Sequence, residues 1–258
     1  MVSESISFYE PNKLDDLQTY AFTTADEDNA NFLYDRSTVT KLLSESSADG
    51  TNEKLLITFA SPQTLDKIAV LAHNIKTGNV KYLNVSLAET DFSTSISWSN
   101  NTTTTNDTYD FTSVTAYGIA LNCTYTQDAG EKSVGQLLGL EEVGSIGAPH
   151  NISPTLKIKK NLKEKVDGGI DKLVEGVKHG VLLDFDNMIT ADLEVYYELA
   201  GRGRPFFIWL SPLSDDQDKL FFREQDFYLV NMTNDAEPEM YQGLTDKSWM
   251  GSIEVMEV

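Results

Sequence analysis

The sequence is poor in cysteine and in basic residues, and each shortage narrows the classes of protein that it can encode. Cys123 is the single cysteine among 258 residues, so a disulfide within the chain is impossible and a cysteine-based zinc site is disfavoured. Lysine and arginine together number 20 against 40 acidic residues, which gives a formal net charge of −20. So acidic a surface repels phosphate backbones and anionic lipids, and we therefore expect no nucleic-acid partner.

Long hydrophobic runs are also missing. No apolar stretch approaches the roughly 18 residues that a membrane span needs, so the sequence predicts none. The first fourteen residues, MVSESISFYEPNKL, show neither the basic nor the apolar region of a secretory signal, which predicts synthesis in a cytoplasm. Apolar residues still make up 40% of the chain and aromatic residues 10%, which is enough for a packed core.

What is present is a succession of short strand patterns in the first half. LLITFA, residues 55–60, is β-branched and aromatic and is bounded by Ser61 and Pro62. Residues 81–90 alternate apolar and polar, as do residues 116–126, and both stretches predict half-buried strands. Residues 68–75 fit either a helical stripe or a buried strand. The spacing predicts a mainly β fold, with a jelly roll or β-sandwich over residues 1–148.

The second half predicts a smaller, β-rich part with one amphipathic helix. A glycine- and proline-containing stretch, residues 144–154, is the strongest composition break, and it predicts a second domain over residues 149–258. The helix is expected near residues 190–200, with Thr190 as its N-cap and Gly201 just past its end. Strands are expected at 206–210, 219–223 and 227–232, and at the C-terminus, near a sheet edge.

Motifs for catalysis, cofactors and metals are missing. The three histidines, His73, His150 and His179, lie in no recognised nucleophile motif, and no glycine pattern matches a nucleotide fingerprint. With 40 acids, no carboxylate pair of a glycoside hydrolase can be singled out. The acidic cluster at residues 26–28 is better explained by a solvated loop than by calcium. We therefore predict no enzyme activity, no catalytic residue, no cofactor and no metal site.

The stretch GRGRPFFIWLSP, residues 201–212, is the most unusual of the second half. A helix-to-strand turn followed by a buried strand explains it best, and an exposed protein–protein contact is the alternative. In the latter case Arg202, Arg204, Trp209 and Trp249 are the interface candidates. Trp98, in SISWSNN, is the candidate for stacking against a glycan. The basic run KIKKNLKEK, residues 157–165, indicates a lysine-rich strand edge or a docking segment for an acidic partner.

Two groups of motifs resemble tailed-bacteriophage virion proteins. The stretches at Asn31–Asp35, Ile57–Phe59, Ile68–Asn74 and Gly135–Gly139 are similar to a discoidin-like (galactose-binding-like) jelly roll. The helix, the PFFIWLSP stretch and the terminal tryptophan-containing strand resemble tail and tail-tip structural proteins. The resemblance implies that residues 68–75 form a strand and that His73 and Asn74 are structural.

The main hypothesis is therefore a structural virion protein of the tail, tail tip or baseplate. It would act by assembly and adaptor contacts with other tail proteins, as a homo-oligomer or ring, and it would reside in the virion. The alternative is a carbohydrate-binding module for host surface glycans on the same jelly roll. A glycoside hydrolase is the third hypothesis, and it lacks a visible catalytic constellation.

Overall fold

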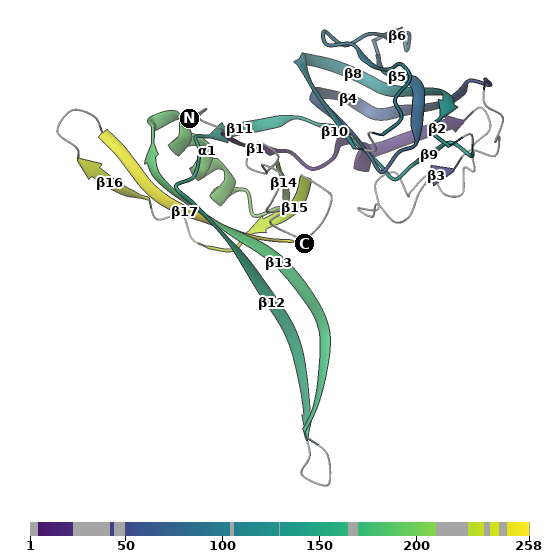
Figure 1. Cartoon of the computed structure of the whole chain (residues 1–258). Helices are drawn as coiled ribbons and strands as arrows, with labels where there is room; N and C mark the ends of the chain where they lie inside the picture. The colour runs from purple at the N-terminus through teal and green to yellow at the C-terminus, as the bar shows by residue number, and fades with distance from the viewer. Residues whose placement is uncertain are drawn as a thin grey trace. The chain divides into compact units, whose positions relative to one another are not determined.

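The structure is a computed structural model of the whole chain (Figure 1). It describes residues 5–22, 42–43, 50–103, 106–128, 130–164, 170–209, 227–234, 238–242 and 247–257. These residues form a mainly β protein with one α-helix, as predicted. None of its helices in these ranges is both long and apolar enough to cross a membrane.

The chain divides into two compact units, and the division differs from the predicted boundary after residue 148. Unit 1 comprises Met1–Tyr9 and Val143–Val258, and unit 2 comprises Glu10–Glu142. The N-terminal strand β1 (Ile6–Tyr9) pairs with β14 (Phe206–Trp209) and so belongs with the C-terminal half. Unit 2 is therefore an insertion after the first strand of unit 1, an arrangement that only long-range pairing reveals.

Unit 2 is built around one seven-stranded antiparallel sheet and a two-stranded one. Its elements are η1 (Lys13–Asp16), β2 (Leu17–Phe22), β3 (Leu42–Leu43), β4 (Glu53–Leu71), β5 (Ile75–Leu83), β6 (Glu89–Thr90), β7 (Ile96–Trp98), β8 (Asp107–Thr126), β9 (Ser133–Val134) and β10 (Gln136–Leu140). Inward residues from both halves of β4, such as Leu55 and Ile68, join one hydrophobic core. The long strands β4 and β8 thus serve both layers of a β-sandwich.

Three predictions for unit 2 need correction or completion. Residues 68–75 are not helical, because β4 continues as a strand to Leu71 and β5 begins at Ile75. Ser61 and Pro62 do not end the strand; they lie at an irregularity where the pairing of β4 with β8 is interrupted. Residues 81–90 are a hairpin rather than one strand. The side chain of Asn84 accepts hydrogen bonds from the backbone of Ser86 and Ala88, which closes a turn between β5 and β6.

Unit 1 is one eight-stranded sheet with a helix packed against it. Its further elements are β11 (Glu142–Ile146), β12 (Asn151–Glu164), β13 (Ile170–Met188), α1 (Thr190–Gly201), β15 (Phe227–Met232), β16 (Glu239–Gln242) and β17 (Lys247–Glu257). The buried face of α1 carries Tyr196 and Leu199, and the Tyr196 hydroxyl donates a 2.8 Å hydrogen bond to the carbonyl of Ser252. The helix therefore anchors to the centre of β17.

The helix near 190–200 and the strands at 206–209 and 227–232 are confirmed, with differences at their ends. Ile189, not Thr190, occupies the N-cap, and its backbone N–H donates to the Asp192 carboxylate at 2.9 Å. Gly203, rather than Gly201, adopts the positive φ that follows the helix. The C-terminal strand lies inside the sheet, between β15 and β13, and not at an edge. The strand expected at 219–223 lies outside the described residues.

Candidate functional site

A row of polar side chains crosses the outer face of the unit 2 sheet. Backbone pairing aligns Lys54 of β4 with Asn122 of β8, Asn122 with Asn79 of β5, and Asn79 with Ser97 of β7. Residues that alternate with them, such as Leu55 and Leu121, are in the core. Because neighbouring residues of a strand face opposite sides, the four polar residues lie on the side that points away from the core.

The amides of this row are joined in a chain of hydrogen bonds. The Thr124 hydroxyl donates to Asn52 Oδ1 at 3.3 Å, and Asn52 Nδ2 donates to Asn122 Oδ1 at 3.4 Å. Asn122 Nδ2 then donates to Asn79 Oδ1 at 3.0 Å. A carboxamide has two acceptor sites and two donors, so each bond within the chain leaves part of that capacity available to a ligand. The chain also holds the amides in fixed orientations.

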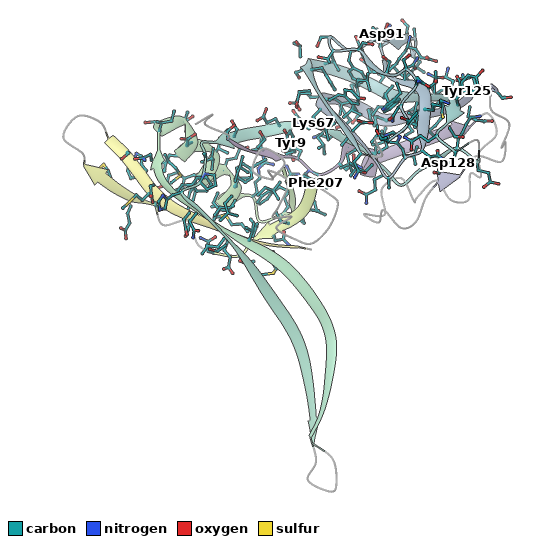
Figure 2. All side chains as sticks on the ribbon, viewed as in Figure 1. Tyr9, Lys67, Asp91, Tyr125, Asp128 and Phe207 are labelled. Atoms are coloured by element: carbon teal, nitrogen blue, oxygen red, sulfur yellow. The ribbon has the colours of Figure 1, made fainter. Side chains whose placement is uncertain are left out.

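Tyr125, labelled in Figure 2, follows Thr124 in β8 and pairs with Thr77 of β5 next to an irregularity in the register. Its side chain is 43% exposed, which is unusual for an aromatic residue at the end of a strand of the core sheet. Its hydroxyl lies 3.5 Å from the place where a β-carbon on Gly50 would be. Gly50 itself donates a backbone hydrogen bond to Thr124, so the phenol lies beside the start of the amide chain. We name Tyr125, Asn52, Thr124, Asn122 and Asn79 the amide–tyrosine face.

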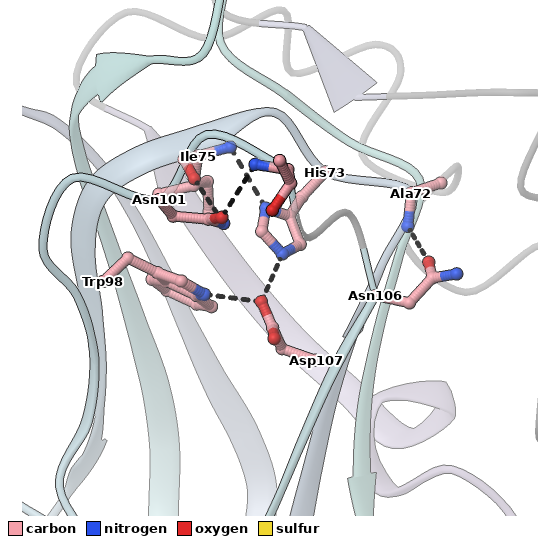
Figure 3. Close-up of polar contacts among 8 residues, drawn as sticks. Ala72, His73, Ile75, Trp98, Asn101, Asn106 and Asp107 are labelled. Carbon is pink, nitrogen blue, oxygen red and sulfur yellow. Dashed lines mark hydrogen bonds and ion pairs between the residues drawn. The ribbon is translucent and has the colours of Figure 1, made fainter. Parts of the chain in front are cut away.

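Trp98, the predicted stacking residue, does not lie on this face. It is 5% exposed, and its indole N–H donates a 2.6 Å hydrogen bond to Asp107 (Figure 3). The ring packs against His73, with centroids 5.1 Å apart, and edge-on against Tyr109. A buried ring with its polar atom satisfied has no open surface to offer a sugar. The sequence pattern, a tryptophan in a polar stretch, could not distinguish a loop platform from a core residue of β7.

His73 is the partner of the same carboxylate, as expected for a structural residue. Its Nε2 lies 2.8 Å from Asp107 Oδ2, and its Nδ1 accepts the backbone N–H of Ile75 at 3.1 Å. Since Nδ1 is an acceptor, Nε2 carries the proton and donates it to Asp107. Asn74 is also structural, because its amide bonds the backbones of Glu131 and Ser133. Both nitrogens of the 1% exposed imidazole are thus engaged.

These contacts determine the pKa shifts of Asp107 and Tyr109. Burial alone would raise the pKa of Asp107, but the hydrogen bonds from His73 and Trp98 outweigh it and hold the pKa below the usual range. Burial, together with the nearby negative charge of Asp107, raises the pKa of Tyr109 to about 12. Asp107 is therefore a charged acceptor for core donors over the physiological range. The described residues contain no group of three or more metal-ligating side chains, and the acidic residues 26–28 lie outside them.

The interface candidates of unit 1 are not gathered into one site. Arg202 is partly buried and donates a 2.5 Å hydrogen bond to Glu198, one helical turn earlier. Arg204 is exposed in the turn before β14. Trp249 is partly buried and packs against the unit 1 core. Trp209 forms the end of β14, paired with Ser7 and Phe227, and its side chain is not described.

Unit 1 also has an open groove of about 580 Å³, which sequence analysis missed. Its polar lining includes His150, Asn151, Asp184, Asp186 and Glu239. Asp184 accepts a 3.1 Å hydrogen bond from Asn151, and Asp186 lies 3.2 Å from His150 Nδ1. Asp186 and Glu239 are exposed at the groove. These residues are dispersed over three strands and a turn in the sequence, so no linear pattern could have indicated them.

Among solved structures, several carbohydrate-binding modules are similar to part of this chain. A chitosan-binding module of a Paenibacillus chitosanase/glucanase is 18% identical, covers 51% of this chain and 100% of its own, and has a TM-score of 0.42. A family 32 carbohydrate-binding module of Clostridium perfringens NanJ, solved with galactose, is 17% identical over 52% of this chain and 99% of its own, with a TM-score of 0.42.

The lectin-binding domain of Lectinolysin, in complex with Lewis b, is 9% identical over 52% of this chain and 98% of its own, with a TM-score of 0.40. Each of these matches covers about half of this chain. No protein-family model and no curated protein matches the sequence. Nothing in these comparisons points to a virion protein.

Proposed function

We propose that unit 2 binds a carbohydrate through the amide–tyrosine face. The observation that carries the proposal is the position of an exposed phenol beside a chain of hydrogen-bonded amides. A sugar ring has an apolar C–H face and a rim of hydroxyls that both donate and accept. An aromatic ring packs against the C–H face, and carboxamides form hydrogen bonds with the hydroxyls.

The proposal rests on residues of this chain rather than on the names of similar modules. Carboxamides are neutral, and the ammonium of Lys54, a residue aligned with Asn122 beside this face, is paired with the Glu89 carboxylate. The face therefore favours a neutral sugar over a phosphorylated or sulfated one, since anions would meet no unengaged cation among its described members and a protein of net charge −20.

The test is a screen of the intact protein on an array of neutral glycans, followed by titration calorimetry with the best ligand. Tyr125→Ala removes the stacking surface and should weaken binding about tenfold, which corresponds to ~1.4 kcal/mol. Asn122→Ala interrupts the amide chain and should weaken binding by a similar factor. Tyr197→Ala is the matched control, because Tyr197 is a 50% exposed tyrosine on α1 of unit 1.

Two results would contradict the proposal. One is an array on which no neutral glycan binds above background. The other is a Tyr125→Ala variant whose affinity equals that of the Tyr197→Ala control. Circular dichroism of each variant separates loss of the site from loss of the fold, since neither side chain belongs to a hydrophobic core.

A second candidate function is structural assembly in a tailed-phage virion, without enzyme activity. The observation that favours assembly is the β12–β13 hairpin, whose strands of 14 and 19 residues are the longest described in unit 1 and extend beyond its sheet. The virion itself is supported only by the sequence resemblance. Mass spectrometry of gradient-purified phage particles from a culture that produces this chain tests it. The chain should be present in stoichiometric amounts in the particle fraction, and its absence there would rule the virion out.

A further inference from the structure

The β12–β13 hairpin continues past the sheet of unit 1 as a two-stranded ribbon (Figure 1). Strand β13 pairs with β17 only between Gly180 and Met188. On the N-terminal side of Gly180, β13 leaves the sheet. Among the strands that the structure describes, residues 155–164 and 170–179 pair only with each other. We call these two segments the ribbon. A two-stranded hairpin by itself is marginally stable in water, so the ribbon needs a further surface to cover it.

Where the ribbon leaves the sheet of unit 1, the register groups lysines on one set of positions. Lys157 is directly opposite Lys178, and Lys159, two positions along the same strand, shares their face. The alternate positions pair Leu156 with His179 and Ile158 with Val177. At this end of the ribbon one set of positions is therefore basic and the other mostly apolar, and we call the positions of Lys157, Lys159 and Lys178 the basic face. Beyond the irregularity between Lys159 and Lys160, lysines pair with apolar residues, as Lys160 does with Val174. Like charges in directly opposed positions are destabilising, and an acidic surface against the basic face would turn this repulsion into attraction.

The charge of the chain indicates that a second copy supplies such a surface. Residues 155–179 contain seven lysines and four acidic residues, a net charge of +3. Because the whole chain has a net charge of −20, the remainder carries −23. Every copy thus combines a basic ribbon with a strongly acidic body, and the ribbon of one copy is complementary to the body of the next.

The groove of unit 1 provides a concave acidic surface for this contact. It is lined by Asp184, Asp186 and Glu239, and the carboxylates of Asp186 and Glu239 are exposed. The ribbon cannot reach the groove of its own copy. Lys178 and Asp184 belong to the same continuous strand, and six residues of extended chain separate them by about 20 Å. The contact must therefore be intermolecular.

We propose that the basic face of the ribbon in one copy docks into the acidic groove of a second copy. The two surfaces are different, so the contact is heterologous, and repetition of it generates a ring or a filament. The carboxylates neutralise the opposed lysines, and docking also covers a ribbon that no other described strand supports. This inference concerns unit 1 and does not depend on sugar binding by unit 2.

The test measures the mass of the intact protein by light scattering after gel filtration, over a concentration series at low salt. The unmodified protein should reach a multiple of 28.7 kDa. It should return towards the monomer when NaCl is raised from about 0.05 to 0.5 M, because salt shortens the Debye length from about 13 Å to about 4 Å. A monomer at every concentration would overturn the proposal, and so would association that salt does not weaken.

Charge reversal identifies the two surfaces. Lys157→Glu/Lys159→Glu should be monomeric, whereas Lys76→Glu/Lys81→Glu, which makes the same charge change in β5 of unit 2, should associate normally. Asp186→Lys/Glu239→Lys should also be monomeric. An equimolar mixture of the ribbon and groove variants should associate again, since one intact ribbon then meets one intact groove.

Retained association of the ribbon variant or of the groove variant would sink the proposal, as would equal loss in the Lys76/Lys81 control. The mixture guards against misfolding, because restored mass requires that both variants are folded. Sugar binding by the same preparations, measured by calorimetry, should be unchanged. An absence of sugar binding in these preparations would count against the proposed function of unit 2. It would not affect the proposed contact between the ribbon and the groove.

Discussion

The indole N–H of Trp98 donates a 2.6 Å hydrogen bond to the carboxylate of Asp107, from a ring that is 5% exposed. The same carboxylate oxygen accepts the imidazole N–H of His73 at 2.8 Å. One partly buried charge therefore connects the end of β7, the start of β8 and the turn between β4 and β5. This arrangement joins three segments of unit 2. It also explains why Trp98 is conformationally fixed in the core and does not form a binding surface.

Replacing Asp107 should destabilise unit 2. In Asp107→Asn the neutral side chain offers one acceptor and loses the charge that strengthens both bonds. We expect the free energy of unfolding to fall by about 2 kcal/mol, measured by urea denaturation with tryptophan fluorescence. Asp91→Asn is the control, because that carboxylate is 69% exposed and its change should lie within about 0.5 kcal/mol. Equal effects of the two substitutions would contradict the role assigned to Asp107.

The same residue predicts the response to acid. The pKa of Asp107 is lowered in the folded state, so its contribution is present above the unfolded value of about 3.9 and is lost as pH falls through the folded pKa. Urea midpoints measured between pH 2 and pH 6 should therefore fall less steeply with acidification in Asp107→Asn than in the unmodified protein. Parallel curves would show that Asp107 titrates alike in the folded and unfolded chains.

Asp66 should show the opposite sign. Burial raises the pKa of its carboxyl in spite of a 2.8 Å hydrogen bond from the backbone of Glu142. A raised carboxyl pKa contributes stability below the unfolded pKa, and this is lost as pH rises through the folded pKa. Between pH 3 and pH 7, Asp66→Asn should thus gain stability relative to the unmodified protein. A relative loss over that interval would mean that the hydrogen bond, not burial, dominates.

Gly118 is required by the close approach of β8 to β4. A β-carbon there would lie 2.1 Å from the carbonyl oxygen of Ile57, so the backbone itself would have to move. Gly118→Ala should cost about 3 kcal/mol in thermal or urea unfolding. Gly130→Ala is the matched control, since no atom lies within 4 Å of its added carbon. A Gly118→Ala protein as stable as this control would refute the tight pairing.

The turn between β5 and β6 stores strain at Leu87. Its φ of 58° lies in the left-handed region, where a side chain costs about 1–2 kcal/mol, and the residue is 56% exposed. Leu87→Gly should raise the free energy of unfolding by about 0.5 kcal/mol, after the entropy cost of glycine is deducted. Val85→Gly, at a 72% exposed position of the same turn without a positive φ, should lower it. If both substitutions changed the free energy of unfolding in the same direction, strain at Leu87 would be contradicted.

The sequence predicted the β class because alternation and β-branched runs are local signals. Residues 55–60, 206–209 and 227–232 are strands as expected, and the helix forms at 190–201, where it buries Tyr196 and Leu199. Tyr197, which the apolar spacing places on the buried side, is 50% exposed. Errors arose where a local signal had a second explanation. Glycine followed by asparagine is a typical turn signal. Gly78 and Asn79 nevertheless lie within β5, where a β-carbon on residue 78 would come within 2.2 Å of the Asn122 carbonyl oxygen.

The candidate sites could not be predicted from the sequence for a related reason. Asn52, Asn79 and Asn122 are spread over 70 residues, and each by itself is an ordinary polar residue. Only the register of β4, β5 and β8 aligns them beside Tyr125. The basic run at 157–165 was visible in the sequence, but its two faces depend on its pairing with residues 170–179.

What the sequence by itself determined is the class of the protein: acidic, rich in strands, with one helix and with a single cysteine that can form no disulfide within the chain. These properties depend on composition and on contacts between near neighbours along the chain. The tertiary structure decided that β1 closes the sheet of unit 1, that Trp98 is buried and Tyr125 exposed, and that two strands of the long hairpin extend together beyond their sheet. Such features depend on pairing between residues far apart in the chain, and local patterns carry no information about which distant strands will meet.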